Sequence, residues 1–159
     1  IFFKAHKFHG DSKNYHSPVN SYINTVLESK KGNPLSICLL YSIIAQSLDL
    51  PIYGVNLPNH FVLAYIDTRG SGAMINEENE FGVLCYINAF SNGVIFNTNE
   101  IKQFLDKLKL PHRREYFEPC SNSAIIKRML NNLISSFQRV GNSEKVEELT
   151  LLRNIIQGN

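Results

Sequence analysis

The segment KKGNPLSICLLYSIIAQSLDLP, residues 30–51, decides the fold. Asn33 can cap a helix with its side chain, and Pro34 suits the first helical position because it has no N–H to leave unpaired. The residues that follow are apolar on nearly every side of a helix that must end before Pro51. A helix of this composition is typical of the buried centre of a domain. We therefore expect one central buried helix.

The hydrophobic period changes after Pro51, where short runs rich in β-branched and aromatic residues begin. Such runs are typical of strands, and four are predicted, at residues 52–55, 61–66, 83–87 and 94–96. A polar, glycine-containing stretch from Asp67 to Glu80 is predicted to be a loop between two of them. The sequence thus predicts an α+β fold, with an antiparallel sheet wrapped on the central helix.

Further helices are expected before and after this core. Residues 18–31 carry apolar residues at helical spacing after a possible cap at Ser17, and a helix capped by Thr98 is expected before Pro111. Residues 124–140 and 144–156 predict a helical hairpin that turns at Gly141 and Asn142. We expect a core domain over residues 1–118 and a helical hairpin over residues 119–159.

Composition excludes several classes of function. The 159 residues are 43% hydrophobic, which is ample for a core, and a net charge of +2 gives no reason to expect nucleic acid or membrane binding. Three cysteines form no metal-binding spacing, so a reduced, cytoplasmic protein without disulfides is expected. His6 and His9 are at most half of a metal site, and no metal or other cofactor is predicted.

A papain-like or transglutaminase-like thiol site has three residues in a set order along the chain. This sequence has counterparts at the start of the predicted helix, at His60 and at Asn88. In such a site the nucleophile lies at a helix N-terminus, which lowers the pKa of a thiol. A histidine on a nearby strand acts as the base, and a polar residue on the next strand orients it. Here the histidine is His60 and the orienting residue is Asn88.

The chain resembles the SirB-type branch of the transglutaminase-like superfamily. The pair GNPLS and LPNHF carries the likeness, YINAFSNG resembles the strand end of that branch, and KRMLNNLISSF is similar to its tetratricopeptide-like tail. The resemblance implies a transglutaminase-like fold over about residues 10–155. It also implies that the catalytic cysteine is missing, as is usual in this branch, whose biochemical activity is not established.

Under that resemblance Pro34 occupies the nucleophile position, where it offers neither a nucleophilic atom nor a backbone N–H. Cys38 lies one turn further along the helix, roughly 6 Å deeper at about 1.5 Å per residue. Ser36 faces another side of the helix. Cys38 is therefore a catalytic candidate only if the protein is an enzyme, and His60 and Asn88 are expected to be vestigial.

Two classes of function remain open, and a third is weaker. The first is a non-catalytic module that binds another protein, with a remnant cleft formed by Asn33, Pro34, Ser36 and Asn59. The second is an amide hydrolase or acyl-transferase that uses His60 and Asn88 with a displaced nucleophile or with water. The third, a regulator of transcription, would act through a protein partner because the sequence has no basic stripe. The basic residues at 112–114 and 127–128 are interpreted as solvated charge, with contact to an acidic partner as the alternative.

Overall fold

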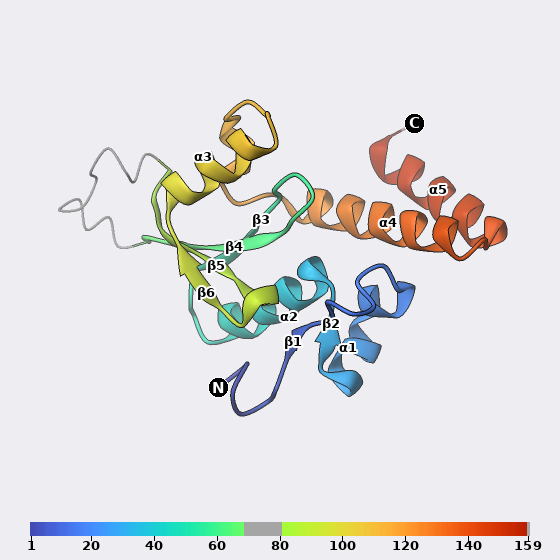
Figure 1. Cartoon of the computed structure of the whole chain (residues 1–159), viewed down its shortest axis with the longest axis horizontal. Helices are drawn as coiled ribbons and strands as arrows, with labels where there is room; N and C mark the ends of the chain where they lie inside the picture. The colour runs from blue at the N-terminus through green and yellow to red at the C-terminus, as the bar shows by residue number, and fades with distance from the viewer. Residues whose placement is uncertain (69–80, 159) are drawn as a thin grey trace.

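A computed structural model describes residues 1–68 and 81–158 of the chain (Figure 1). The loop expected between Asp67 and Glu80 lies almost entirely outside these residues. The described residues form a four-stranded antiparallel sheet with α2 on one face and α3 on the other, followed by a pair of long helices. The predicted α+β fold with C-terminal helices is confirmed.

The sheet is a simple meander in the order β3-β4-β5-β6. The strands run over Ile52–Val55 (β3), Val62–Ile66 (β4), Val83–Asn88 (β5) and Val94–Phe96 (β6). These bounds agree with the predicted strands to within one residue. Alternate side chains of β4 enter opposite faces, since Leu63 joins one hydrophobic cluster while Val62 and Ala64 join the other.

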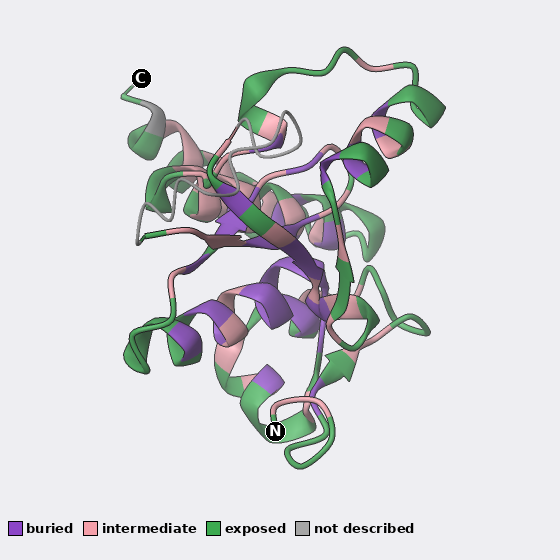
Figure 2. Cartoon of the chain, turned by 90° about the vertical axis from the view of Figure 1, so that its left-hand side faces the viewer, coloured by how far each residue is buried: buried purple, intermediate pink, exposed green. Residues whose placement is uncertain are grey.

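Helix α2 (Pro34–Ser47) covers the first face of the sheet. Its side chains Ile37 and Cys38 are completely buried, and Figure 2 shows most of the helix coloured as buried. Near its C-terminus, however, Ile43 is 53% exposed and Ile44 is 40% exposed. The central helix is thus buried in its first half, and one side of its last turns faces solvent.

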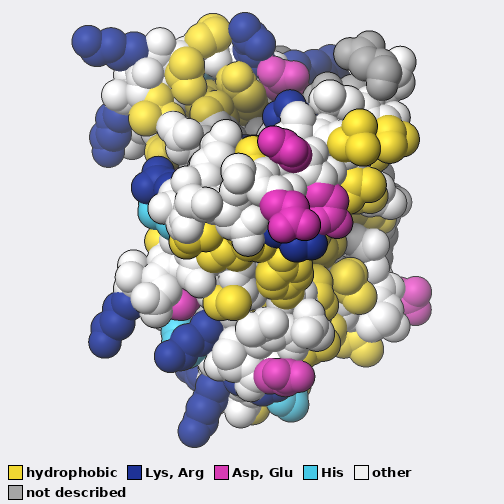
Figure 3. Space-filling view, turned by 90° about the vertical axis from the view of Figure 1, so that its right-hand side faces the viewer, with side chains coloured by type: hydrophobic (Ala, Val, Ile, Leu, Met, Phe, Trp, Pro, Cys, Tyr) yellow, Lys and Arg dark blue, Asp and Glu magenta, His cyan; other side chains and the backbone are white. Residues whose placement is uncertain are grey.

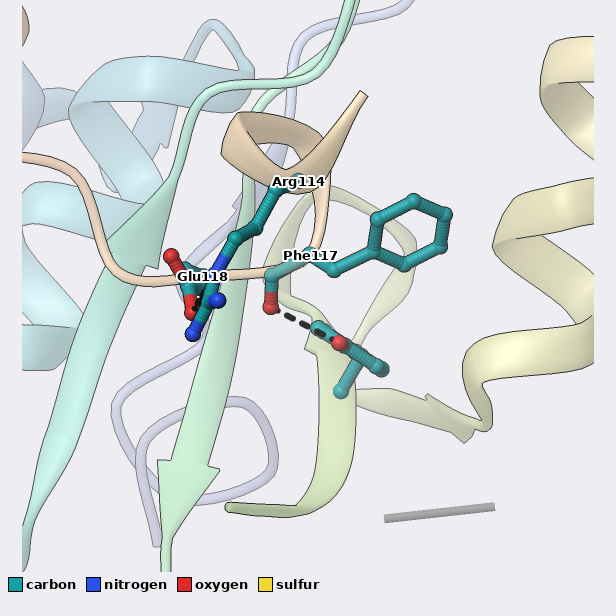
Figure 4. A network of polar contacts seen from close by, with 4 residues as sticks. Arg114, Phe117 and Glu118 are labelled. Carbon is teal, nitrogen blue, oxygen red and sulfur yellow. Dashed lines mark hydrogen bonds and ion pairs between the residues drawn. The ribbon is translucent and has the colours of Figure 1, made fainter. Parts of the chain in front are cut away.

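The second face carries α3 (Thr98–Lys107) and the segment around the short 3-10 helix η5 (Arg114–Tyr116). The hydroxyl of Tyr86 donates a hydrogen bond to the carbonyl of Phe117 at 2.8 Å, while Arg114 pairs with Glu118 at 2.6 Å (Figure 4). Burial raises the pKa of Tyr86 to about 12. This contact attaches the link between α3 and the last two helices to the sheet.

Helix α3 begins one residue earlier than the sequence suggested. Its cap is Asn97, whose side chain accepts a bond from the backbone of Glu100, while the Glu100 carboxylate accepts one from the backbone of Asn97. This reciprocal capping box satisfies two backbone N–H groups that a helix start leaves open. The predicted cap at Thr98 was therefore wrong by one position.

The single helix expected over residues 18–31 is wrong. The structure has a 3-10 helix, Pro18–Ser21 (η1), then α1 (Ile23–Ser29), and then the short strand β2 (Lys31–Gly32), which pairs in parallel with β1 (His9–Gly10). Ser17 makes no capping hydrogen bond. Lys30 takes the left-handed conformation that ends α1, with φ of 63°.

Buried polar contacts explain this interruption. Asn20 and Ser21 are only 3% and 4% exposed, although both are polar. The Asn20 carbonyl accepts bonds from the Ser36 hydroxyl at 2.6 Å and the Asn33 backbone at 3.3 Å, and Ser21 accepts from the Asn33 side chain at 2.8 Å. A continuous helix would draw the Asn20 carbonyl into its own backbone bonding and take this acceptor from the buried Ser36 hydroxyl and the Asn33 N–H, and buried polar groups without a partner are costly.

The last two helices are α4 (Asn122–Arg139) and α5 (Ser143–Gln157), which form the predicted hairpin. Ile125 and Met129 of α4 pack against the cluster around α2. Several apolar residues of α5 remain exposed, and Figure 3 shows clusters of exposed hydrophobic side chains on the side of the molecule that includes the α4–α5 turn. Among the described helices, none has the length and apolar content needed to cross a bilayer.

Candidate functional site

A cavity of about 400 Å³ lies between the start of α2, the turn before β4, the segment near Tyr15 and one side of α4. Four of the residues expected from the sequence line it, together with their neighbours Leu35 and Phe61, and the other lining residues come from segments that sequence analysis did not connect to the site. The lining residues are Tyr15, His16, Asn33, Pro34, Leu35, Asn59, His60, Phe61, Arg128, Asn132, Ser135, Ser136 and Arg139.

The start of α2 forms one wall and has little left to offer a ligand. Pro34 has no N–H, and the N–H of Ser36 is bound to the side-chain oxygen of Asn33 at 2.9 Å. The Asn33 amide in turn donates to Ser21. The side chain that reaches the cavity at the first helical position is thus an unreactive pyrrolidine ring, and the Asn33 cap takes up the N–H of Ser36.

The two possible substitutes for a nucleophile, Ser36 and Cys38, do not line the cavity. The Ser36 hydroxyl is buried and donates to the carbonyl of Asn20. The Cys38 thiol is 0% exposed and donates to the carbonyl of Phe61 at 3.4 Å, and burial raises its pKa to about 12. A thiol in that state is almost wholly protonated at neutral pH and is out of reach of solvent.

A tight turn places His60 at the cavity. The backbone N–H of His60 donates to the carbonyl of Leu57 at 3.2 Å, and Asn59 has a φ of 58°. Pro58 followed by a residue with positive φ is the pattern of a type II turn, and asparagine tolerates that conformation better than most residues. The turn explains why Pro58, Asn59 and His60 stand together immediately before β4.

The imidazole of His60 is held in its neutral form. Burial lowers its pKa below the usual value; a hydrogen bond with the side chain of Asn88 works in the opposite direction, and the charge of Arg128 lowers the pKa further. Asn88 ends β5 and caps the 3-10 helix η4 (Ala89–Ser91), accepting a bond from the Ser91 backbone. The histidine and its expected orienting residue are therefore in contact.

The interpretation of residues 127–128 as solvated charge is wrong for Arg128 of α4, because its side chain is bonded within the protein. Its guanidinium is partly buried and reaches back to the turn, where Nη1 donates to the Asn56 side chain at 2.9 Å and to the Leu57 carbonyl at 3.1 Å. Nη2 approaches the carbonyl of His60 at 3.5 Å. Arg128 thus fixes the backbone that carries the histidine. Burial lowers the pKa of this arginine.

The rest of α4 supplies a polar stripe that sequence analysis missed. Arg128, Asn132, Ser135 and Arg139 are spaced by four, three and four residues, which puts them on one face of a helix, and all four line the cavity. The signal was present as a polar periodicity opposite the apolar one. The apolar positions alone predict the hairpin, and a polar helix face usually faces solvent.

The cavity is rich in positive charge. Arg128 and Arg139 bring two guanidinium groups to its lining, and the imidazole rings of His16 and His60 lie there too. The lining contains no aspartate or glutamate, and neither arginine forms an ion pair with a carboxylate in the described ranges. In those same ranges, no group of three or more histidine, cysteine or acidic side chains is placed to hold a metal ion.

The structure brings together Asn33, Pro34, Asn59 and His60 at one cavity, with Asn88 behind the histidine. It does not bring Ser36 or Cys38 to that surface. Two arginines, Tyr15 and His16 are additions from distant segments. What the arrangement offers chemically is a neutral imidazole and fixed cations, without a thiol or hydroxyl at the start of α2.

Comparison with known proteins identifies the relatives of this chain. A model of the family described as the transglutaminase-like superfamily matches residues 1–131. Human F-box only protein 21 is 29% identical over 142 residues, which are 89% of this chain and 21% of that protein. The UPF0162 protein of Haemophilus influenzae is 29% identical over 141 residues, covering 84% of this chain and 50% of that protein.

A second bacterial relative, the UPF0162 protein of Vibrio cholerae, is 28% identical over 142 residues, with 87% of this chain and 48% of that protein covered. No solved structure matches the chain. The chain therefore spans about half the length of these two bacterial relatives and about a fifth of F-box only protein 21.

Proposed function

The chain belongs to the transglutaminase-like superfamily, and we propose that it serves there as a non-catalytic, protein-binding module of the SirB type. The observation that carries this proposal is that Pro34, which the family resemblance places at the nucleophile position, lines the same cavity as His60. Proline supplies no lone pair for attack and no N–H for an oxyanion.

The neighbouring side chains support the same conclusion. Cys38 is buried, with a pKa raised to about 12, and Ser36 is bonded to a buried carbonyl, so neither can attack a substrate in the cavity. Asn33, Asn59, His60 and Asn88 then shape and line a binding cleft instead of carrying out a reaction. No cofactor is proposed.

The relatives are consistent with a module that works inside larger proteins. In F-box only protein 21 the matching stretch is 21% of the chain. We propose that residues 1–118 form the transglutaminase-like part and that residues 119–159 form a tetratricopeptide-like hairpin that contributes to partner binding. The partner would be a protein in the cytoplasm, with no direct contact to nucleic acid.

Intact-mass spectrometry tests the proposal. The protein is incubated with glutamine-containing peptides and acyl esters, and a covalent acyl-protein is sought at neutral pH. We expect no adduct on the folded protein. A stoichiometric adduct that is lost in a His60→Ala variant of unchanged melting temperature would overturn the proposal.

One observation favours a second candidate, an amide hydrolase that uses water as the nucleophile. His60 is neutral, contacts Asn88 and lines the cavity, which is the state that a general base requires. Release of ammonia or amine from amide substrates, abolished by His60→Ala and retained by Lys127→Gln, would support this candidate.

A further inference from the structure

We propose that the cavity recognises an extended, acidic peptide segment of the partner, with carboxylates bound by Arg128 and Arg139. This inference rests on the proposed protein-binding function and adds the chemistry of the bound segment. It follows from the placement of charge along α4, the length of the polar stripe and the hydrogen-bonding groups that remain open.

The two arginines are cations without a carboxylate to balance them in the described part of the chain. Arg139 forms no ion pair there, and Arg128 is held only by neutral oxygen atoms. The cavity lining has no acidic residue. Arg139 is exposed, but the guanidinium of Arg128 is partly buried. Removing such a group from water is costly unless a negative group compensates it, so an anionic ligand suits this site.

The guanidinium of Arg128 retains hydrogen-bond donors that a ligand could use. Both hydrogens of Nη1 are directed to Asn56 and Leu57, and Nη2 makes one long contact with the His60 carbonyl. The Nε–H and one Nη2–H have no protein acceptor among residues 1–68 and 81–158. Donors that a guanidinium keeps free in this way can bind the oxygens of a carboxylate.

The spacing of the stripe indicates an extended ligand. Arg128 and Arg139 are eleven residues apart on one helix, which separates them by roughly 16 Å at about 1.5 Å per residue. An extended peptide spans the same distance in about five steps of 3.3 Å. Asn132 and Ser135 lie between the arginines and offer both donors and acceptors to a peptide backbone.

A phosphate group fits this site less well than a carboxylate. Phosphate sites at a helix N-terminus depend on free backbone N–H groups. Among the first three residues of α2, Pro34 has none and the Ser36 N–H is already bound by Asn33, which leaves only the Leu35 N–H. The permanent charges are far apart along α4 and not gathered around one point. A chain with a carboxylate at each end therefore matches the stripe better than one compact, highly charged anion.

Fluorescence polarisation with labelled hexapeptides tests this inference. The peptides have amidated C-termini, glutamate at positions 1 and 6 and mixed residues between. A matched pool carries glutamine at both ends, and inorganic phosphate serves as a competitor. We expect the glutamate pool to bind at least ten times more tightly than the glutamine pool, with affinity falling as salt rises.

Two variants locate the contact. Arg139→Gln removes an exposed side chain and should weaken binding of the glutamate pool about tenfold, since bonds to a charged group are the stronger kind. Lys127→Gln makes the same charge change on the same helix but does not line the cavity, and it should leave affinity unchanged. Equal effects of the two variants would show only a general attraction and would overturn the inference.

The remaining outcomes are also decisive. Equal binding of both pools, no binding of either, or displacement of the peptide by phosphate at equimolar concentration would each reject the acidic peptide. None of these results depends on whether an amide is hydrolysed. Failure of this inference can therefore be distinguished from failure of the proposed function, which is decided by adduct formation or turnover.

Discussion

The guanidinium of Arg128 donates a hydrogen bond through Nη1 to the side-chain oxygen of Asn56 at 2.9 Å, across 72 positions of sequence. The bond joins α4 to the turn that presents His60. The geometry of the cavity thus depends on a residue of α4 as well as on the start of α2 and the turn before β4.

Replacing Arg128 by glutamine should lower the free energy of unfolding by about 2 kcal/mol, because bonds from a charged donor to partly buried acceptors are lost. Urea denaturation followed by circular dichroism measures the change. Lys127→Gln is the matched control and should alter stability by less than about 0.5 kcal/mol. A similar small change for Arg128→Gln would show that the turn is held by other contacts.

Replacing Pro34 by cysteine should create a reactive thiol where none exists. The start of α2 lies at the cavity, and a helix N-terminus favours the thiolate. Iodoacetamide labelling at pH 8, located by peptide mass spectrometry, should find the introduced thiol modified and Cys38 unmodified. The urea-unfolded protein, in which every thiol is accessible, provides the reference. Rapid labelling of Cys38 in the folded wild type would contradict its burial and its raised pKa.

Titration of His60 should occur below its usual range. Burial lowers the pKa of His60 in the folded state, so the unfolded chain binds the proton first as pH falls. The stability contributed by the neutral ring is present above about pH 6.5 and is lost as pH falls through the folded pKa. NMR of the ring protons, assigned with His60→Gln, measures this. A midpoint at or above that of the unfolded chain would refute the assigned environment.

Asn88→Asp should raise the pKa of His60, since a carboxylate beside the ring stabilises the imidazolium. The carboxylate can still accept the bond from the Ser91 backbone, so the fold should be retained. The same NMR titration measures the shift, with Asn88→Ala as the variant that lacks both contacts. An unchanged midpoint in Asn88→Asp would mean that residue 88 does not approach the ring in solution.

Much of the core could be predicted from the sequence because its signals are local. The four strands follow from runs of β-branched and aromatic residues, and α2 follows from Asn33, Pro34 and the apolar run behind them. The type II turn at Pro58 and Asn59 is likewise indicated by two adjacent residues. These patterns need no knowledge of distant contacts.

The broken helix near Asn20 could not be predicted in the same way. Its apolar spacing favours a continuous helix, but the structure buries Asn20 and Ser21 and pairs them with the start of α2. Those hydrogen bonds join residues 12 and 16 positions apart. Periodicity within a window cannot show which polar groups will be buried by another segment.

The part of the cavity lining that comes from α4 could not be predicted for a related reason. The basic and polar residues of α4 resemble an ordinary solvated face until α4 is placed against the turn at His60. Arg128 is distinguished from its neighbour Lys127 by contacts with residues about 70 positions away in the sequence. The sequence could place the histidine and the proline in the site, but it could not supply their charged surroundings.

The central claim is that the cavity holds a histidine without a nucleophile. Its most direct test is the release of ammonia or amine from a panel of glutamine-containing peptides and simple amides, measured at neutral pH for wild type, His60→Ala and Lys127→Gln. We predict release no faster than the protein-free rate for all three proteins. Turnover by wild type and Lys127→Gln that disappears in a folded His60→Ala variant would contradict the account.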